Sequence, residues 1–262
     1  MIYSSLTSGV LLSPNFSKRL GYKVTKITPH QAAGKINAYN LANIFTKESR
    51  EASANYCIGD DGLIFCSVPE EYRAWTSSSA WNDRQAITIE IANDVNGYPW
   101  SVGEKAWKAF KDLFLDLCLR YDIYPDLPDG DINKNITYHR YYAETTCPGP
   151  WIEQHLPALI KETRKAMDEL KKIEEQITIL VKAVKDYDKR IDALETVVAG
   201  YVYPRYHTID DIKNDPRASW AVPYVNWALE NKIIYGISAE DLGLSYNDLR
   251  LLAYIKRASE LK

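Results

Sequence analysis

The spacing of apolar and polar residues predicts alternating strands and helices over residues 1–162. Strands are expected at residues 24–30, 86–92 and 136–139, and a hairpin at 55–58 and 63–68 around the turn Asp61-Gly62. Helices are expected at residues 35–50, behind the capping pair Ser101 and Glu104, and after Pro150. This alternation predicts an α/β fold, with a mixed central β-sheet flanked by helices.

A different pattern follows at Lys165. No glycine or proline occurs from Lys165 to Ala199, and apolar residues recur every seven positions in two series. The first series is Leu170, Ile177, Val184, Ile191 and Val198, and the second is Ile173, Leu180, Tyr187, Leu194 and Tyr201. A seven-residue repeat is typical of a coiled coil and predicts a homo-oligomer, either a dimer or a trimer. A long helix folded back on the first domain is the alternative.

These patterns divide the chain into three parts. At 262 residues it exceeds one average domain. We expect a first domain at residues 1–162, a coiled-coil helix at 163–201 and a small α-helical C-terminal module at 202–262. The order of short helices in the module is loosely similar to a single S-layer-homology-type repeat.

Charge and cysteine content limit the partners and the compartment. The net charge is −3 without a basic cluster, so a nucleic-acid partner is not expected. The first residues lack the pattern of a signal peptide and no apolar run is long enough to span a membrane, which predicts a soluble protein made in the cytoplasm. Four cysteines do not indicate a disulfide scaffold at this length. Cys118 is expected in the core, while Cys57 and Cys66 flank the hairpin turn and could pair.

Two histidines and a cysteine are the candidate metal ligands. His30 ends the first predicted strand, and His139 and Cys147 lie eight residues apart across a loop closed by Pro148-Gly149. Two imidazoles and one thiolate are ligands that zinc accepts, and three protein ligands leave a fourth position open, as catalytic zinc sites do.

Glu90 is the second candidate for chemistry. On the strand at 86–92, Ile87, Ile89 and Ile91 share one face, while Glu90 lies on the other. A carboxylate within an apolar strand is costly unless it is paired or used. Glu90 is therefore expected either to act as a general base or to form a buried salt bridge, for example with an arginine.

An ordered set of motifs then carries a resemblance. The set is His30, Ser53-Ala-Asn-Tyr56, Ala74-Trp-Thr76, Ile87-Thr-Ile-Glu-Ile-Ala-Asn93, His139 and Thr145-Thr-Cys-Pro-Gly149. It resembles the zinc-dependent N-acetylmuramoyl-L-alanine amidases of the phage-lysozyme and peptidoglycan-recognition-protein type. The resemblance covers about residues 1–162.

The resemblance implies roles for individual residues. It makes His30, His139 and Cys147 the zinc ligands, and Glu90 the base that then donates a proton to the leaving amine. It directs the Tyr56 hydroxyl towards the oxyanion that forms in the reaction. The alternative is that Tyr56 only packs within the hairpin. Thr145 stands where phage-type relatives often carry lysine, so it is an auxiliary donor. Asn55, Trp75 and Thr76 are expected in the substrate groove.

The implied activity is hydrolysis of the amide between N-acetylmuramic acid and L-alanine of peptidoglycan. A zinc-activated water would make the attack. Without a signal peptide, a phage or prophage endolysin that acts on the wall after release is favoured. The alternatives are a bacterial autolysin and a non-catalytic peptidoglycan-binding protein. The C-terminal module would then be an accessory or wall-targeting unit.

Overall fold

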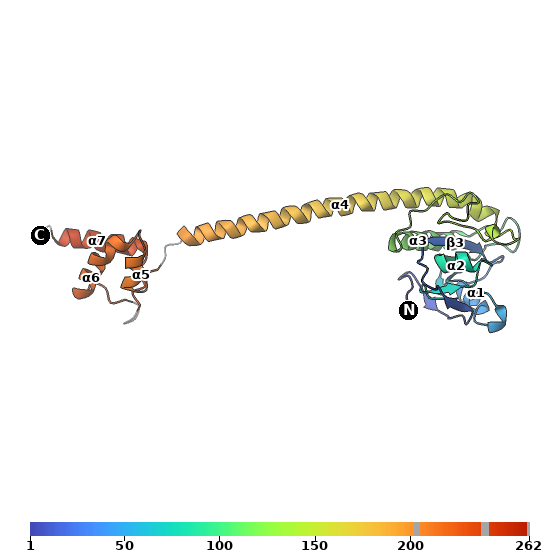
Figure 1. Cartoon of the computed structure of the whole chain (residues 1–262), viewed down its shortest axis with the longest axis horizontal. Helices are drawn as coiled ribbons and strands as arrows, with labels where there is room; N and C mark the ends of the chain where they lie inside the picture. Colours follow the sequence, from blue (N-terminus) through green and yellow to red (C-terminus); the bar gives the residue numbers. More distant parts are fainter. Residues whose placement is uncertain (202–204, 237–240, 261–262) are drawn as a thin grey trace. The chain divides into compact units, whose positions relative to one another are not determined.

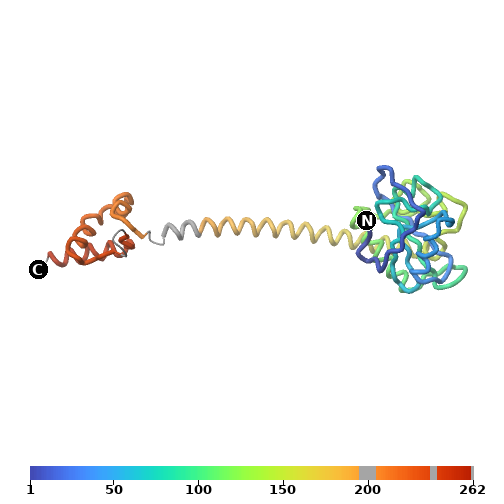
Figure 2. Tube along the Cα trace, turned by 90° about the horizontal axis from the view of Figure 1, so that it is seen from below, coloured from blue at the N-terminus to red at the C-terminus, as the bar shows by residue number. Residues whose placement is uncertain are grey.

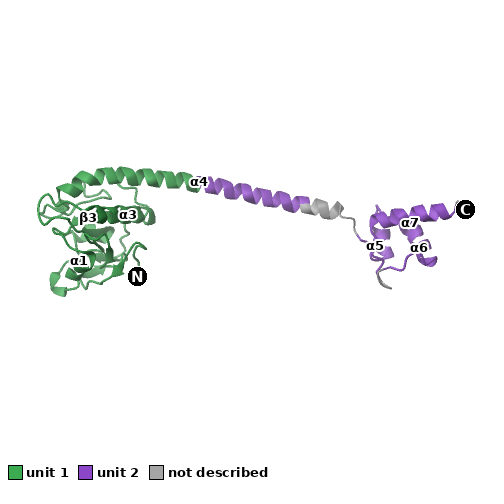
Figure 3. Ribbon diagram, turned by 180° about the vertical axis from the view of Figure 1, so that it is seen from behind, with its two compact units in different colours: residues 1–174 green, residues 175–262 purple. Residues whose placement is uncertain are grey.

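The computed structural model describes the backbone of residues 1–201, 205–236 and 241–260, and the side chains of these residues except 195–201. The chain forms two compact units, residues 1–174 and 175–262, which are coloured separately in Figure 3. In the part of the chain that is described, no helix combines the length and the apolar character needed to cross a membrane.

A five-stranded mixed sheet organises the first unit, as the sequence predicts (Figure 1). The strands lie in the order β1 (Gly9–Val10), β5 (Ile64–Cys66), β4 (Tyr56–Ile58), β7 (Ala86–Ile91) and β3 (Lys26–Gln31). β4 and β5 are antiparallel, whereas β7 runs parallel to both β4 and β3. A separate antiparallel pair is formed by β2 (Phe16–Lys18) and β6 (Tyr72–Ala74).

The two faces of the sheet differ in polarity, because side chains alternate along a strand. Ile87, Ile89 and Ile91 of β7 lie on one face, which packs against α3 (Glu104–Arg120) and the beginning of α4 (Pro150–Tyr201). This is the main core, and its largest fully buried side chains include Phe110, Phe114, Leu113, Leu117 and Ile152. The other face carries α1 (Ala38–Ile44), which buries Leu41 and Ala42 near Cys57, and α2 (Ala80–Gln85).

Several predicted boundaries differ from the structure. The helix expected at 35–50 is only α1, which begins behind Asn37 because its side chain caps the Asn40 N–H, and a separate 3₁₀ helix η1 (Glu48–Arg50) follows. The capping-box prediction is wrong: the Ser101 hydroxyl donates to Asp94, and Gly103 precedes α3. The strand expected at 136–139 is reduced to one bridge between Ile27 and Ile136.

The cysteines are free thiols. Cys57 stands opposite Phe65 and Cys66 opposite Tyr56 in the β4–β5 register, so the two thiols lie on different faces of the sheet and no disulfide joins them. Cys118 is fully buried in the main core, which confirms the prediction for it.

α4 joins the predicted helix after Pro150 and the predicted helix at 163–201 into one helix of 52 residues. Its trace is unbroken over residues 150–194 in Figure 2. The first turns bury Ile152, Leu156 and Ile160 against the core of the first unit. From Leu170 to Leu194 the residues of both heptad series are exposed in the single chain. Val198 and Tyr201, the last residues of the two series, lie outside the described side chains.

The C-terminal helices of the second unit form a core of their own. They are α5 (Ile209–Asn214), the 3₁₀ helix η3 (Ser219–Ala221), α6 (Val222–Glu230) and α7 (Tyr246–Ser259). Capping boxes at Thr208 and Ser245 begin α5 and α7. The core is small and its buried members include Ile212, Val225, Ala228, Leu249 and Leu252.

Candidate metal centre and active site

The site lies where β3 and β7 end side by side. His30 and Glu90 are register partners on these parallel strands, so both side chains project from the face opposite the main core. His30 is buried, with 1% of its surface exposed. The predicted strand end at His30 therefore places an imidazole beside the carboxylate that the sequence singled out.

The three predicted ligands meet at this point. The 3₁₀ helix η2 (His139–Tyr141) begins at His139, and the Arg140 N–H donates to the Cys147 carbonyl at 3.2 Å, which closes the loop carrying the thiol. Candidate ligand atoms of His30, His139 and Cys147 all lie within 4.8 Å of one another. The Cys147 Sγ is 3.3 Å from His30 Nδ1, and the two imidazole ring centres are 5.0 Å apart.

The residues present fit a zinc ion. Burial, with a further contribution from nearby His139, lowers the pKa of His30 well below its usual value, and burial also lowers the pKa of His139. Both imidazoles are therefore neutral, as metal ligands must be. His30 Nε2 is buried without a hydrogen-bond partner among the described residues. Burial raises the pKa of the Cys147 thiol, so a cation is needed to stabilise its thiolate in this position.

A cavity of about 410 Å³ opens onto these groups. Glu90 lines it together with the three ligands, and burial raises the pKa of Glu90 to about 8, although the charge of Arg50 opposes this shift. No hydrogen bond or ion pair to the Glu90 side chain is found in the described part of the chain, so the buried salt bridge considered for it is not seen.

Three further predicted residues line the same cavity. Thr145 does so two residues before Cys147, and its Oγ1 accepts a hydrogen bond from the Cys147 N–H at 3.3 Å. Trp75 lies on the loop after β6, where its indole N–H donates to Ser17 at 3.2 Å. Thr76 lines the cavity while its hydroxyl donates to the Ser53 carbonyl at 2.6 Å.

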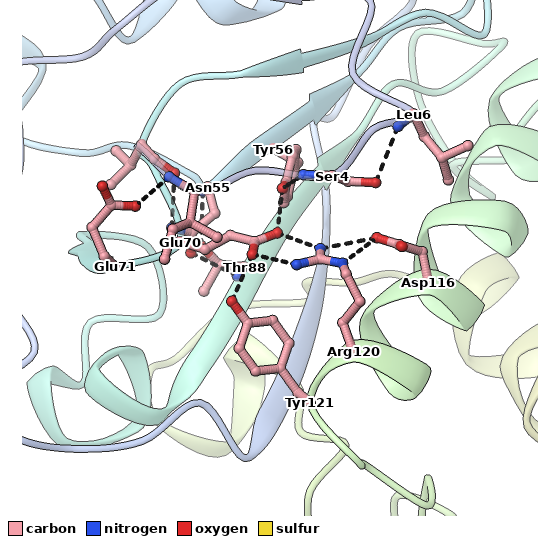
Figure 4. A network of polar contacts seen from close by, with 12 residues as sticks. Ser4, Leu6, Asn55, Tyr56, Glu70, Glu71, Thr88, Asp116, Arg120 and Tyr121 are labelled. Carbon is pink, nitrogen blue, oxygen red and sulfur yellow. Dashed lines mark hydrogen bonds and ion pairs between the residues drawn. The ribbon is translucent and has the colours of Figure 1, made fainter. Parts of the chain in front are cut away.

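Tyr56 and Asn55 are not part of the cavity, which corrects the expectation for both. Tyr56 is fully buried on the core face, where its hydroxyl donates to Glu70 and accepts a hydrogen bond from the Ser4 N–H at 2.7 Å (Figure 4). The side chain of Asn55 is also buried. Its amide donates to the Val68 carbonyl at 3.0 Å and accepts from the Thr88 N–H at 3.0 Å, which ties the hairpin to β7.

The partner of Tyr56 belongs to a network that the sequence did not predict. The Glu70 carboxylate accepts hydrogen bonds from Arg120 at 2.6 and 2.7 Å and from the Tyr121 hydroxyl at 2.6 Å (Figure 4). Asp116 holds the same guanidinium from one turn earlier on α3. Glu70 is about 50 residues from the end of α3 that carries its partners, so no local signal could have indicated the network.

Ser78 is a second residue that sequence reasoning missed. Its hydroxyl lies 3.3 Å from His139 Nε2, and its backbone has a positive φ of 61°. The buried carboxylate of Asp83 anchors this loop by accepting the backbone N–H groups of Thr76 and Ser77. The available signal was the run of three serines before α2, because serine is common at the N-cap of a helix and Ser79 caps α2. The run therefore marks the loop that carries Ser78.

The α/β fold, the His–His–Cys cluster and the carboxylate in one cavity suit a metal-dependent hydrolase. A family model described as N-acetylmuramoyl-L-alanine amidase matches residues 20–150. The chain belongs to the N-acetylmuramoyl-L-alanine amidase family. Comparison with curated proteins gives no match.

Solved structures that are similar to the chain come from several proteins. PlyL is 20% identical, with 62% of this chain and 98% of that chain covered and a TM-score of 0.44. An AmpD derivative is 19% identical, with 62% and 96% covered and a TM-score of 0.45. A mutant endolysin from Bacillus subtilis is 18% identical, with 62% and 98% covered and a TM-score of 0.45.

Proposed function

We propose that this cavity hydrolyses the amide between N-acetylmuramic acid and the L-alanine of the stem peptide, with zinc held by His30, His139 and Cys147. The observation that carries the proposal is the convergence of the three ligand atoms within 4.8 Å in a cavity that Glu90 also lines. Family membership defines the bond that is cut. A bound zinc ion would lower the pKa of a water molecule and polarise the scissile carbonyl.

Glu90 is the residue that moves the proton. Its carboxylate faces the cavity beside the ligands and has no hydrogen bond or ion pair within the described residues, so it is free to accept a proton from the attacking water. Delivery of that proton to the leaving amine completes the reaction, since an amide nitrogen departs only when protonated.

Thr145 and Trp75 orient the substrate. Because Thr145 Oγ1 accepts from the Cys147 N–H, its own O–H remains available to donate to the oxygen that gains charge in the reaction. The Trp75 indole is fixed by Ser17, which leaves its ring as a firm wall of the cavity. Thr76 is anchored to Ser53 and supports the same wall.

Digestion of purified walls by the full chain tests this function. Mass spectrometry should find stem peptides with free N-terminal L-alanine, and metal analysis about one zinc per chain. Cys147→Ser should lose both zinc and activity, whereas Cys118→Ala, which changes a buried thiol remote from the cavity, should retain both. Activity of wild type after complete metal removal, or cleavage at another bond, would contradict the proposal.

We extend the proposal to the biological role of a phage or prophage endolysin. The order of motifs resembles the phage-lysozyme type, and the amidase unit is followed by a long helix and a small separate module. Expression in a host whose membrane is then permeabilised should cause lysis, and Cys147→Ser should not. Lysis that requires no permeabilisation would instead indicate a secreted autolysin.

The exposed seam of α4 supports self-association as a parallel dimer or trimer. Eight described seam residues from Leu170 to Leu194 are 40–63% exposed in the single chain. Burying them against the same seam of a second copy removes apolar surface from water. Between parallel helices we also expect Arg190 of one copy to pair with Glu195 of the other, and the side chain of Glu195 lies outside the described residues. Light scattering should show an oligomer for the full chain and a monomer for residues 1–162; a monomeric full chain at micromolar concentration would refute association.

The C-terminal module would localise the enzyme on the wall. None of its described residues is a ligand of the metal centre, and its Trp220 and Tyr235 are 39% and 76% exposed. A tagged 163–262 fragment should bind purified walls, more strongly as an oligomer than when the helix is shortened to a monomer. If a folded, oligomeric fragment does not bind walls that the full enzyme digests, the module would only cap the coiled coil and stabilise the oligomer.

A further inference from the structure

A second cavity, of about 490 Å³, lies at the opposite end of β3 from the metal centre. Lys26, at the beginning of the strand, lines it, and we call it the aromatic cavity because Trp81, Tyr121 and Tyr124 also line it. Lys26 and His30 lie on the same face of β3, four residues apart, which is about 13 Å at the usual rise of a strand. The two cavities are therefore distinct, and each receives a side chain from the same face of β3.

The aromatic rings of this cavity are held in place by cations. The Lys26 ammonium lies 4.3 Å from the ring centre of Trp81, and the Arg164 guanidinium lies 5.2 Å from that of Tyr124. Such contacts fix the orientation of a ring. Trp81 and Tyr124 remain 38% and 47% exposed, so ordered aromatic surface is available to a ligand.

Polar groups with unused hydrogen-bonding capacity surround these rings. Lys26 is 3% exposed and donates to the Ile132 carbonyl, but no carboxylate forms an ion pair with it in the described part of the chain. An ammonium has three donors, so capacity remains. The amide nitrogens of Gln85 and Asn133 are bonded within the protein, and their oxygens have no partner among the described residues.

This combination suits an N-acetylated sugar. A pyranose ring offers an apolar C–H face for stacking on an aromatic ring, and its hydroxyl and acetamido groups need donors and acceptors at the rim. A peptide adding as a strand is excluded, because residues 135–137 already cover β3: the Ile27 N–H donates to the Asn135 carbonyl at 2.8 Å. Asp122 and Asp126 line the cavity too, which disfavours an anion.

One segment borders both cavities. Thr76 lines the catalytic cavity, Ser78 contacts His139, and α2 then places Trp81 and Gln85 in the aromatic cavity. A polymer with one unit at the metal centre can therefore continue along this segment to the second cavity. We propose that the aromatic cavity is a second binding site, for the glycan strand of peptidoglycan, which rests on the proposed function for the identity of the polymer.

Binding of a peptide-free glycan tests the site independently of hydrolysis. The probe is the β-1,4-linked tetramer of N-acetylglucosamine, titrated into the full chain by calorimetry or NMR. Loss of one aromatic stacking partner should weaken binding about two- to tenfold in Trp81→Ala, whereas Trp81→Phe should retain most of the affinity. Tyr39→Ala is the matched control, since Tyr39 is an exposed aromatic of the same unit that lines neither cavity. Absence of tetramer binding by wild type, or equal binding by Trp81→Ala, overturns the proposal.

Kinetics then connect the site to the reaction. Trp81→Ala should raise KM on intact walls severalfold with kcat unchanged, and should leave hydrolysis of a single-sugar muramyl peptide unaffected. An equal loss on both substrates would mean that Trp81 acts on the catalytic cavity, which contradicts a separate glycan site. If wild type releases no peptide from any wall, the proposed function fails, while tetramer binding still decides whether the cavity holds sugar.

Discussion

Glu70 and Glu90 belong to the same unit and lie on opposite sides of its sheet, where their carboxylates have very different numbers of hydrogen-bond donors. Burial raises the pKa of Glu70, but hydrogen bonds from Arg120, Tyr121 and Tyr56 outweigh that effect and hold it below its usual value (Figure 4). At Glu90 burial is opposed by the charge of Arg50, which lines the same cavity, and the pKa rises to about 8. The number of donors, more than burial itself, separates the two carboxylates.

The difference shows how one fold uses the same residue type in two ways. A buried carboxylate that accepts several hydrogen bonds is a fixed anion and joins segments that are distant in sequence. A carboxylate left without donors costs folding free energy, which is characteristic of groups that take part in chemistry. We therefore expect Glu70 to act in structure and propose Glu90 for catalysis, and each of the following changes tests that division.

Glu90→Gln should produce the largest effect. The amide preserves shape but cannot exchange the proton, so activity on walls should fall at least about 100-fold, the lower end of general acid–base contributions. Zinc content should not change, because none of the three ligands is altered. Stability should be equal or higher, since the substitution removes a partly buried carboxylate that has no ion pair among the described residues. Peptide release, metal analysis and chemical denaturation give the three readouts, and activity within about threefold of wild type would move Glu90 to a structural role.

Glu70→Gln should instead reduce stability. It removes the charge that pairs with the Arg120 guanidinium, which is 32% exposed, and replaces one acceptor oxygen by an NH2 donor, so it should lower the free energy of unfolding of the first unit by about 2–4 kcal/mol. Activity of the folded fraction at low temperature should remain near wild type. Urea denaturation followed by fluorescence measures the loss.

A surface pair provides the control for that variant. Asp112 forms an ion pair with Lys108, and their side chains are 47% and 75% exposed. Asp112→Asn should change stability by less than about 0.5 kcal/mol. If Glu70→Gln changed stability as little as Asp112→Asn, the network in Figure 4 would contribute little to the free energy of unfolding. Glu70 would then not have the structural role that distinguishes it from Glu90.

The pH dependence of stability should carry the signature of Glu70. Its pKa in the folded state lies below the unfolded value of about 4.3, so its contribution is complete above that pH and is lost as the pH falls towards the folded pKa. Wild type should therefore lose stability below about pH 5 more steeply than Glu70→Gln. Parallel profiles of unfolding free energy between about pH 3.5 and 6 would mean that other carboxylates dominate acid unfolding.

The sequence predicted those parts of the site that depend on local pattern. His30 at a strand end, Glu90 on the polar side of β7 and the loop from His139 to Cys147 lie where alternation and spacing indicated, and the mixed sheet is confirmed. Trp75, Thr76 and Thr145 also line the cavity. The ligand, catalytic and binding roles of all these residues stay predictions.

The sequence could not show which face a short strand presents to the site. β4 has only three residues, so its alternation gives no period, and resemblance alone directed Tyr56 to the cavity. Pairing with β7 decides the matter: Cys57 stands opposite Glu90, and Tyr56 is therefore on the core face. The Glu70 network and the aromatic cavity depend on long-range contacts that no local pattern records.

Among the buried residues tested, Tyr56→Phe should have the smallest effect on activity and stability together, and it separates the two roles considered for this residue. In the structure the Tyr56 hydroxyl bonds only Glu70 and the Ser4 N–H among the described residues, so its removal should cost about 1 kcal/mol of stability. Activity should stay within about twofold of wild type, because Arg120 and Tyr121 still hold Glu70. An oxyanion donor, by contrast, contributes about 10²–10³ in rate. A loss of that size in a variant with wild-type zinc content and nearly wild-type stability would require the β4 hairpin to present Tyr56 to the cavity during the reaction.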